Sequence, residues 1–494
     1  MICLLPSKIT DKHLYPLYPL FPLTQLSNPL PEKKYEPSLQ KSKYMQLTTK
    51  HWQKTPILAT LTIIATIGFQ AYAHQNPINQ KSQSDYQYPF ELSTSRNLIG
   101  SLSKEIAFYQ QRIQQRPEDG LDRVALARVY LKMARTSGDS KWYTLAEELS
   151  QESLAKLPFE NHGALLVLAT VAEARHDFAE TIRLSEKSLQ TKPNNQDALA
   201  MLVTANLAKG KVKTARVFAN RLVEKIPTLN SFTLRALVNI AQGKDKAAIE
   251  DFKSAIASEE PGEIATSAKV RTLLGRFYLS RGKYSLAEQL FTEALRILPQ
   301  YPFALLNLAE LEVERKNFQE AEKYYTQVLD VGGNNKSNTF DHQALMGIAR
   351  VKKIQDNISG AEEYWNKAEK SFQEHSHEHH HEHSHNHKQD FGHRRDLAKL
   401  LLLRGNFQDL PKALSLMQSE VKIRRDAETL DTLAQILYRL QRPQEAKKLY
   451  QEILETGIKD AQIFNRAGII ETELGNPEQA KIYFQTALEV NPNI

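Results

Sequence analysis

A small side chain recurs at a nearly constant interval through most of this chain, and no other feature constrains its fold as strongly. The recurring position is alanine nine times and threonine once, at Ala146, Thr181, Ala215, Ala248, Ala287, Ala321, Ala361, Ala413, Ala446 and Ala480. The successive intervals are 35, 34, 33, 39, 34, 40, 52, 33 and 34 residues. Six of the nine lie within one residue of 34, which indicates an array of repeats instead of one conventional core.

The residue types around this position predict a pair of helices in each period. A small residue allows two helix backbones to approach closely, and a bulky residue four positions later fills the gap beside it at Phe252, Phe291, Tyr325, Trp365, Tyr450 and Phe484. Prolines twelve residues after the small position are expected to end the second helix, because proline cannot continue the hydrogen-bond ladder; they are Pro158, Pro193, Pro227, Pro299 and Pro492. Some units depart from the pattern and are expected to be looser: the bulky position holds Ser150, Ser185 and Ala219, and Glu420 stands where a small apolar residue belongs.

The full pattern is similar to the tetratricopeptide repeat family. Residues 273–278 read Leu-Leu-Gly-Arg-Phe-Tyr and lead into Gly282, Ala287, Phe291, Ala294 and Pro299; the register returns at Gly468, Gly475, Ala480, Phe484, Ala487 and Pro492. The resemblance implies an all-α, right-handed helical solenoid of about ten helix pairs, over residues 96–372 and 394–494. It further implies that a protein or peptide partner binds in a concave groove, whose side chains by register include Thr204, Thr272, Arg276, Glu310, Asp431, Gln435, Tyr438, Asn465 and Thr472.

The longest interval contains a histidine-rich insertion, which we expect to be a disordered loop over residues 373–393. It carries His375, His377, His379, His380, His381, His383, His385 and His387. Imidazole is a good ligand for Zn, Ni and Cu, so the tract is expected to bind such ions weakly at several sites. Two alternatives stay open: a polar spacer, or a segment that acts by protonation near pH 6. Of the scattered histidines, His342 and His393 could reach the tract.

No catalytic pattern is convincing, and we predict that the chain is not an enzyme and requires no cofactor. The tract matches H-E-x-x-H at residues 377–381 and 381–385. That chemistry needs a packed helix, and the flanks offer no apolar face, so the match reflects histidine density. Nucleotide-binding glycine loops, a nucleophile elbow and Cys–His pairs are not found in the sequence.

The N-terminal region has the pattern of a secretory signal. Lys50, His51 and Lys54 precede an apolar run over residues 57–69 and then Ala71-Tyr72-Ala73. We interpret residues 45–73 as a signal peptide cleaved after Ala73, which makes the protein periplasmic or secreted. The alternative is an uncleaved membrane anchor with the solenoid outside the cytoplasm. Residues 1–44 are interpreted as an extension ahead of a true start at Met45, and residues 74–95 as a flexible polar linker.

Charge and cysteine content narrow the function classes. The net charge is +7, but residues 1–73 hold eight lysines and three acids and so contribute +5, leaving a nearly neutral repeat region. Nucleic-acid binding is therefore not expected. The single cysteine, Cys3, lies ahead of Met45, which excludes disulfides and thiolate metal sites from the repeats.

These observations predict a non-enzymatic interaction scaffold of the cell envelope whose histidine tract binds transition metal for buffering, sensing or delivery. The alternative is a purely structural adaptor in an envelope assembly, such as polysaccharide export or outer-membrane maintenance, with the tract as a spacer. The sequence ends two residues after Pro492. We therefore expect Ala467, Ile470 and Leu474 to be partly exposed and to offer a surface for self-association.

Overall fold

The computed structural model describes residues 86–92, 98–137, 139–331, 340–377 and 393–494, with side chains of the fourth segment described to Phe372. The expected extension, signal peptide and first part of the linker lie outside the described residues, as does most of the histidine tract. The described residues belong to one compact unit, Tyr86–Ile494. Within them, no helix combines the length and the apolar character needed to cross a bilayer.

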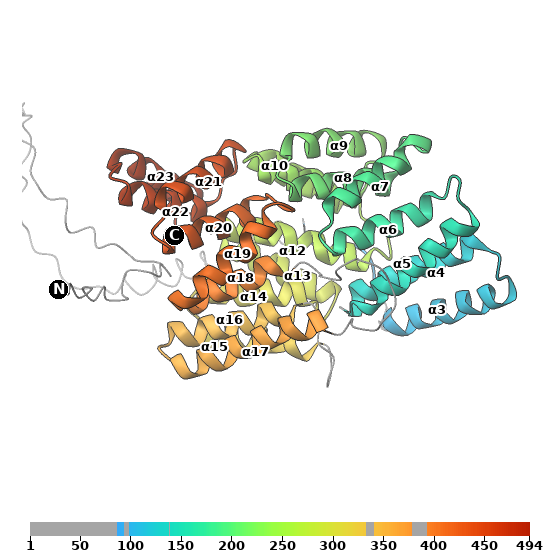
Figure 1. Cartoon of the computed structure of the whole chain (residues 1–494), viewed down its shortest axis with the longest axis horizontal. Helices are drawn as coiled ribbons and strands as arrows, with labels where there is room; N and C mark the ends of the chain where they lie inside the picture. Colours follow the sequence, from blue (N-terminus) through green and yellow to red (C-terminus); the bar gives the residue numbers. More distant parts are fainter. Residues whose placement is uncertain (1–85, 93–97, 138, 332–339, 378–392) are drawn as a thin grey trace, which may run out of the picture. The chain divides into compact units, whose positions relative to one another are not determined.

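The described part of the chain is helical throughout, with a single helix followed by ten helix pairs (Figure 1). This confirms the predicted all-α repeat fold. The helices are α3 (Leu98–Gln115), α4 (Gly120–Ser137), α5 (Lys141–Lys156), α6 (His162–Ala174), α7 (Phe178–Thr191), α8 (Gln196–Ala208), α9 (Val212–Lys225), α10 (Leu229–Ala241), α11 (Asp245–Ala257), α12 (Ile264–Ser280), α13 (Tyr284–Ile297), α14 (Pro302–Glu314), α15 (Phe318–Asp330), α16 (Asp341–Ile354), α17 (Ile358–His377), α18 (Arg394–Arg404), α19 (Leu410–Glu420), α20 (Ala427–Arg439), α21 (Pro443–Glu455), α22 (Ala461–Glu473) and α23 (Pro477–Val490), with a short 3-10 turn at Phe407–Asp409 before α19.

The repeated residues pack as their types predict. All ten small positions are buried, and so are the bulky residues from Phe252 to Tyr450, while Phe484 in the last pair is half-buried. A Cβ added at Gly275 would lie 2.4 Å from the ring of Phe291, so only glycine fits there. Each of the five prolines follows the end of a second helix by two residues, as expected from its missing N–H.

Turns of early pairs contact segments that come much later in the sequence, namely the connection before α20 and the residues after α23. The backbone N–H of Arg425, before α20, donates to the carbonyl oxygen of Ala208 at the end of α8 over 2.8 Å. The side-chain amide of Asn493 donates to the carbonyl oxygen of Gly282, between α12 and α13, over 3.1 Å. The guanidinium of Arg424 lies 5.3 Å from the ring centroid of Phe178, at the start of α7. We call this set of contacts the seam.

A short segment ahead of the helices packs against α12, α13 and α14. Tyr88 is 3 % exposed and lies in a cluster with residues of all three helices. Its backbone N–H donates to Glu293 over 2.7 Å, and the carbonyl of Tyr86 accepts from Arg271 over 2.6 Å. Residues 86–92 were expected to be part of a flexible linker; their aromatic side chains instead bury themselves on the repeats, because Tyr88 and Phe90 gain more from packing than a polar linker would.

The last helix pair differs from one expectation. Ala467 and Ile470 are each only 2 % exposed, and Leu474 is half-buried, so the expected exposure is wrong for the first two. Both are covered because α22 packs against α21 on one side and α23 on the other. The apolar side chains that are exposed here lie on α23 instead, at Ile482 and Leu488.

Candidate functional site

The nine residues predicted to line a groove do not share one environment. Arg276 and Thr472 are exposed, and Thr204, Glu310, Gln435, Tyr438 and Asn465 are half-buried. Thr272 is fully buried and donates its hydroxyl hydrogen to the Ala268 carbonyl within its own helix, so its placement in a groove was wrong. Thr272 lies 15 residues before the small residue Ala287, and Asp431 lies 15 residues before Ala446 and is buried as well, so this register position packs inward in both pairs. Asp431 is also largely buried, at 9 % exposure, but its carboxylate forms an ion pair with Arg466.

Glu310 on α14 is held by residues of the next two helices. The hydroxyl of Tyr325 on α15 donates to one carboxylate oxygen over 2.5 Å, and the guanidinium of Arg350 on α16 donates to the other over 2.6 Å. Burial would raise the pKa of Glu310, but Arg350 and Tyr325 lower it below its usual range. The carboxylate is therefore charged and fixed in position at neutral pH.

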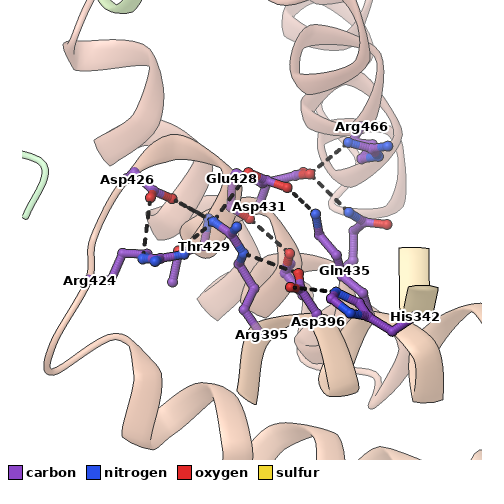
Figure 2. Close-up of polar contacts among 12 residues, drawn as sticks. His342, Arg395, Asp396, Arg424, Asp426, Glu428, Thr429, Asp431, Gln435 and Arg466 are labelled. Carbon is purple, nitrogen blue, oxygen red and sulfur yellow. Dashed lines mark hydrogen bonds and ion pairs between the residues drawn. The ribbon is translucent and has the colours of Figure 1, made fainter. Parts of the chain in front are cut away.

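Asp431 on α20 is surrounded in the same way (Figure 2). The hydroxyl of Tyr450 on α21 donates to one oxygen over 3.0 Å, and Arg466 on α22 donates to the other over 2.7 Å. The amide of Gln435 adds a third hydrogen bond of 3.0 Å. Burial raises the pKa of Asp431 despite the opposing charge of Arg466. Here too, acid, tyrosine and arginine come from three successive helices.

The two arrangements form one motif: a carboxylate on a first helix, a tyrosine on the second, and an arginine on the next first helix. Sequence reasoning identified both acids, and it identified Tyr325 and Tyr450 as packing residues. It missed Arg350 and Arg466. A usable signal was present, because these arginines lie 40 and 35 residues after their acids, about one repeat away. Both stay partly accessible, with side chains 24 % and 29 % exposed.

The histidine tract begins inside a helix. We expected the helix to end near Phe372, but α17 continues to His377 and so includes His375 and His377. The cause is local, since the polar residues after Phe372 are compatible with a helix and the first glycine comes only at position 392. The other six histidines of the tract, His379 to His387, lie outside the described residues.

Two scattered histidines meet at the base of this insertion. His342, in the first turn of α16, and His393, immediately before α18, lie with Asp396 so that one ligand atom of each falls within 4.8 Å of the others. The Nε2 atom of His342 is 3.3 Å from Oδ2 of Asp396. Phe372 packs on both imidazoles, with ring centroids 4.7 and 5.8 Å away. The two sides of the insertion therefore converge on His342, and these three residues could hold a metal.

Arginine charges close to this cluster are balanced by other carboxylates (Figure 2). Arg395 lies 3.2 Å from Glu428 and 3.5 Å from Asp426, closer than its 3.9 Å approach to Asp396. Burial would raise the pKa of Asp396, but His342 and Arg395 lower it below its usual range. On the seam, burial and the charges of Arg424 and Arg395 lower the pKa of His176 to about 3, so this imidazole is neutral.

Known protein families match two regions of the chain. Models of the tetratricopeptide repeat match residues 233–302 and 278–338, which lie in α10 to α15 and the connection that follows. Two further tetratricopeptide models match residues 427–459 and 461–494, and these correspond to the pairs α20–α21 and α22–α23. The acid and the tyrosine of both motifs therefore lie in recognised repeats of this family.

Two curated relatives share a short stretch of sequence. The uncharacterized protein ycf37 of Pyropia yezoensis is 39 % identical over 70 residues, which are 14 % of this chain and 39 % of that protein. The protein of the same name in Porphyra purpurea is 33 % identical over 78 residues, 16 % of this chain and 45 % of that protein. The chain thus spans less than half the length of either relative.

Solved structures of similar repeats include pilF of Pseudomonas aeruginosa, with 20 % identity, 53 % of this chain and 96 % of that chain covered, and a TM-score of 0.32. The human IFIT1 dimer with PPP-AAAA has 15 % identity, covers 83 % of this chain and 99 % of that one, and gives a TM-score of 0.42. Likenesses at this level say nothing about what the chain binds. The family models, the interval of the small residues and the ten helix pairs together show that the chain is a tetratricopeptide repeat protein.

Proposed function

We propose that this protein is a non-enzymatic interaction scaffold of the cell envelope, and that its acid–tyrosine–arginine motifs bind a partner protein. The observation that carries the proposal is that Arg350 and Arg466 are both held in place and partly exposed. Each guanidinium is oriented by a carboxylate yet stays about a quarter exposed, at 24 % and 29 %. Preorganised, partly accessible arginine is a common anchor at protein interfaces, because little side-chain entropy remains to be lost on binding.

The partner test uses the full chain as bait for an envelope extract. The double variant Arg350→Ala/Arg466→Ala should lose the captured partner, whereas Arg183→Ala should keep it. Arg183 is a matched control, because it is 61 % exposed and pairs only with Glu180 one turn away on the second helix α7. Equal capture by the double variant and the control would refute the use of these arginines.

The envelope location rests on the signal pattern at residues 45–73. Mass spectrometry of the mature protein should find an N-terminus at His74 if the segment is cleaved after Ala73. An intact segment in a membrane fraction would support the anchored alternative, and an intact segment in a cytoplasmic fraction would remove the envelope proposal. Self-association through α23, which exposes Ile482 and Leu488, is part of the same proposal and would appear as a concentration-dependent mass in solution.

The metal role rests on the density of imidazole in the tract and on the ring cluster at its base. Replacing the eight tract histidines by serine should remove most bound zinc or nickel and change thermal unfolding little. Unchanged metal uptake would support the purely structural adaptor. In that case, partner capture should also be the same with and without a chelator.

A further inference from the structure

We propose that His342, His393 and Asp396 form an ordered zinc site between α16 and α18, separate from the weak sites of the tract. This inference rests on the proposed metal role of the insertion and names where one ion is held firmly. Three protein ligands with one remaining position for water are a common way to bind zinc. Nitrogen and carboxylate donors without sulfur fit Zn²⁺ and neighbouring divalent ions better than Cu⁺.

The distances fit such an ion. Zinc bound at about 2.0–2.1 Å in a tetrahedron places neighbouring ligand atoms about 3.3 Å apart. The Nε2 of His342 and Oδ2 of Asp396 are 3.3 Å apart, which is one edge of that tetrahedron. The third ligand atom, from His393, lies within 4.8 Å of both, and the second and third edges would form when this atom moves closer to the ion.

The pairing of His342 and Asp396 is a poor hydrogen bond but a suitable pair of ligands. His342 is 3 % exposed, and within the described structure its Nε2 has no partner with hydrogen-bond geometry, although a carboxylate oxygen lies beside it. A buried nitrogen in this state is costly. A metal ion bound by both atoms would account for the arrangement, because each atom would then donate a lone pair to the ion.

The surroundings leave the carboxylate available. Arg395 is the cation nearest to Asp396, and its Nε approaches Oδ1, the oxygen that faces away from His342, at 3.9 Å. The same guanidinium is neutralised more closely by Glu428 and Asp426. Among the described residues, Arg395 therefore approaches Asp396 at Oδ1 and not at Oδ2, and the ring of Phe372 packs against His342 and His393 beside the site.

An ion at this place would connect the two sides of the insertion. His342 belongs to α16, and His393 and Asp396 belong to the start of α18, so the ion would fix the junction between two helix pairs. It would hold this junction at the point where the regular repeat interval is interrupted. We therefore expect zinc to order the first turns of α16 and α18.

The test is a zinc titration of the full chain against a colorimetric zinc chelator of known affinity. The wild type should show one tight site and several weak ones. Changing a residue that only supports a metal ligand typically costs 10–100-fold in affinity, so Asp396→Asn and His342→Gln should each weaken the tight site by about 100-fold or more. Asp356→Asn is the matched control, since Asp356 is exposed just beyond the other end of α16; its zinc affinity should match the wild type.

A tract variant separates this inference from the proposed function. With the tract histidines replaced by serine and the three cluster residues kept, the tight site should remain while the weak sites disappear. The inference is overturned if both ligand variants keep the tight site, or if the tract variant loses it. If His342→Gln fails to fold by circular dichroism, Asp396→Asn still decides, because its side chain is 23 % exposed at the helix start. Cobalt loading gives a second measurement, and tetrahedral absorption should appear in the wild type and not in Asp396→Asn.

Discussion

The backbone N–H of Arg425 donates a hydrogen bond to the carbonyl oxygen of Ala208 over 2.8 Å, although Ala208 belongs to the third helix pair and Arg425 directly precedes the ninth. The turns that join the two helices of a pair have a residue with positive φ in most pairs. Where a turn lies on the seam, that residue is glycine at Gly210 and Gly282, and also at Gly243, which lies against the backbone of Gly457; His176 is the exception. In turns away from the seam, this residue is a glycine at Gly405 and Gly475 and carries a side chain at Lys316, Asp356 and Gln441.

Gly210→Ala and Gly243→Ala should destabilise the protein more than Gly475→Ala. All three lie at positive φ, which costs an L-residue about 1–2 kcal/mol. At Gly243 an added Cβ would lie 2.1 Å from the Gly457 carbonyl oxygen, whereas at Gly475 nothing lies within 4 Å. The clash should add about 1–3 kcal/mol. Chemical denaturation measures the difference, and three equal losses would show that the seam does not form.

Most of the fold follows from the sequence, because its signals are local. The small and bulky positions define each helix pair from neighbouring residues, and five of the ten pairs end two residues before a proline. The seam could not be predicted, since Gly210 and Gly243 carry the same sequence signal as Gly475, an ordinary turn glycine. The contact of Arg425 with Ala208 depends on how small rotations add up over six pairs.

Tyr88→Phe and Tyr88→Ala should have opposite effects on the docked segment. The hydroxyl of Tyr88 is buried without a hydrogen-bond partner among the described residues, so its removal should be neutral or stabilising. Truncation to alanine removes a ring that is 3 % exposed and should cost about 3 kcal/mol. Limited proteolysis at residues 86–92 reports the result; faster cleavage of Tyr88→Phe than of wild type would contradict the packing.

Arg271→Met should be strongly destabilising. The side chains of Arg271 and Glu259 are 0 % and 1 % exposed and pair directly, so removing the cation leaves a buried carboxylate uncompensated. Such a loss is typically about 3–5 kcal/mol. The double variant Arg271→Met/Glu259→Gln should recover part of the loss, as measured by urea unfolding. If Arg271→Met were as stable as the wild type, the account would be contradicted, because Glu259 would then have to be solvated by water in place of Arg271.

Glu420→Gln should increase stability at pH 7 and not at pH 4. Burial raises the pKa of Glu420, opposed by Arg424, Arg394 and Arg395, and neither of its oxygens accepts a hydrogen bond in the described structure. A raised pKa in the folded state favours folding below the unfolded value and loses that contribution as pH rises through the folded value. We expect a gain of about 1 kcal/mol at pH 7. A variant less stable at pH 7 would show that the pair with Arg424 outweighs burial.

Only part of the candidate site could be predicted, because its residues are far apart in the sequence and meet only in the folded chain. The tract was evident from composition, and His342 and His393 were recognised as near it. Asp396 was not, because an aspartate near a helix start is ordinary until the structure brings α16 and α18 together. In the same way, Arg350 and Arg466 could be recognised as part of the acid–tyrosine–arginine motif only from the structure, which shows that the next repeat brings them into contact with the acids.

The most direct test of the account is hydrogen–deuterium exchange of the full chain with and without one equivalent of zinc. The account predicts slower exchange in the first turns of α16 and α18, around His342 and Asp396, with α22 and α23 unchanged as an internal reference. Exchange that is unaltered at both turns, or slowed only within residues 378–392, would contradict a zinc ion held at the junction of these helices.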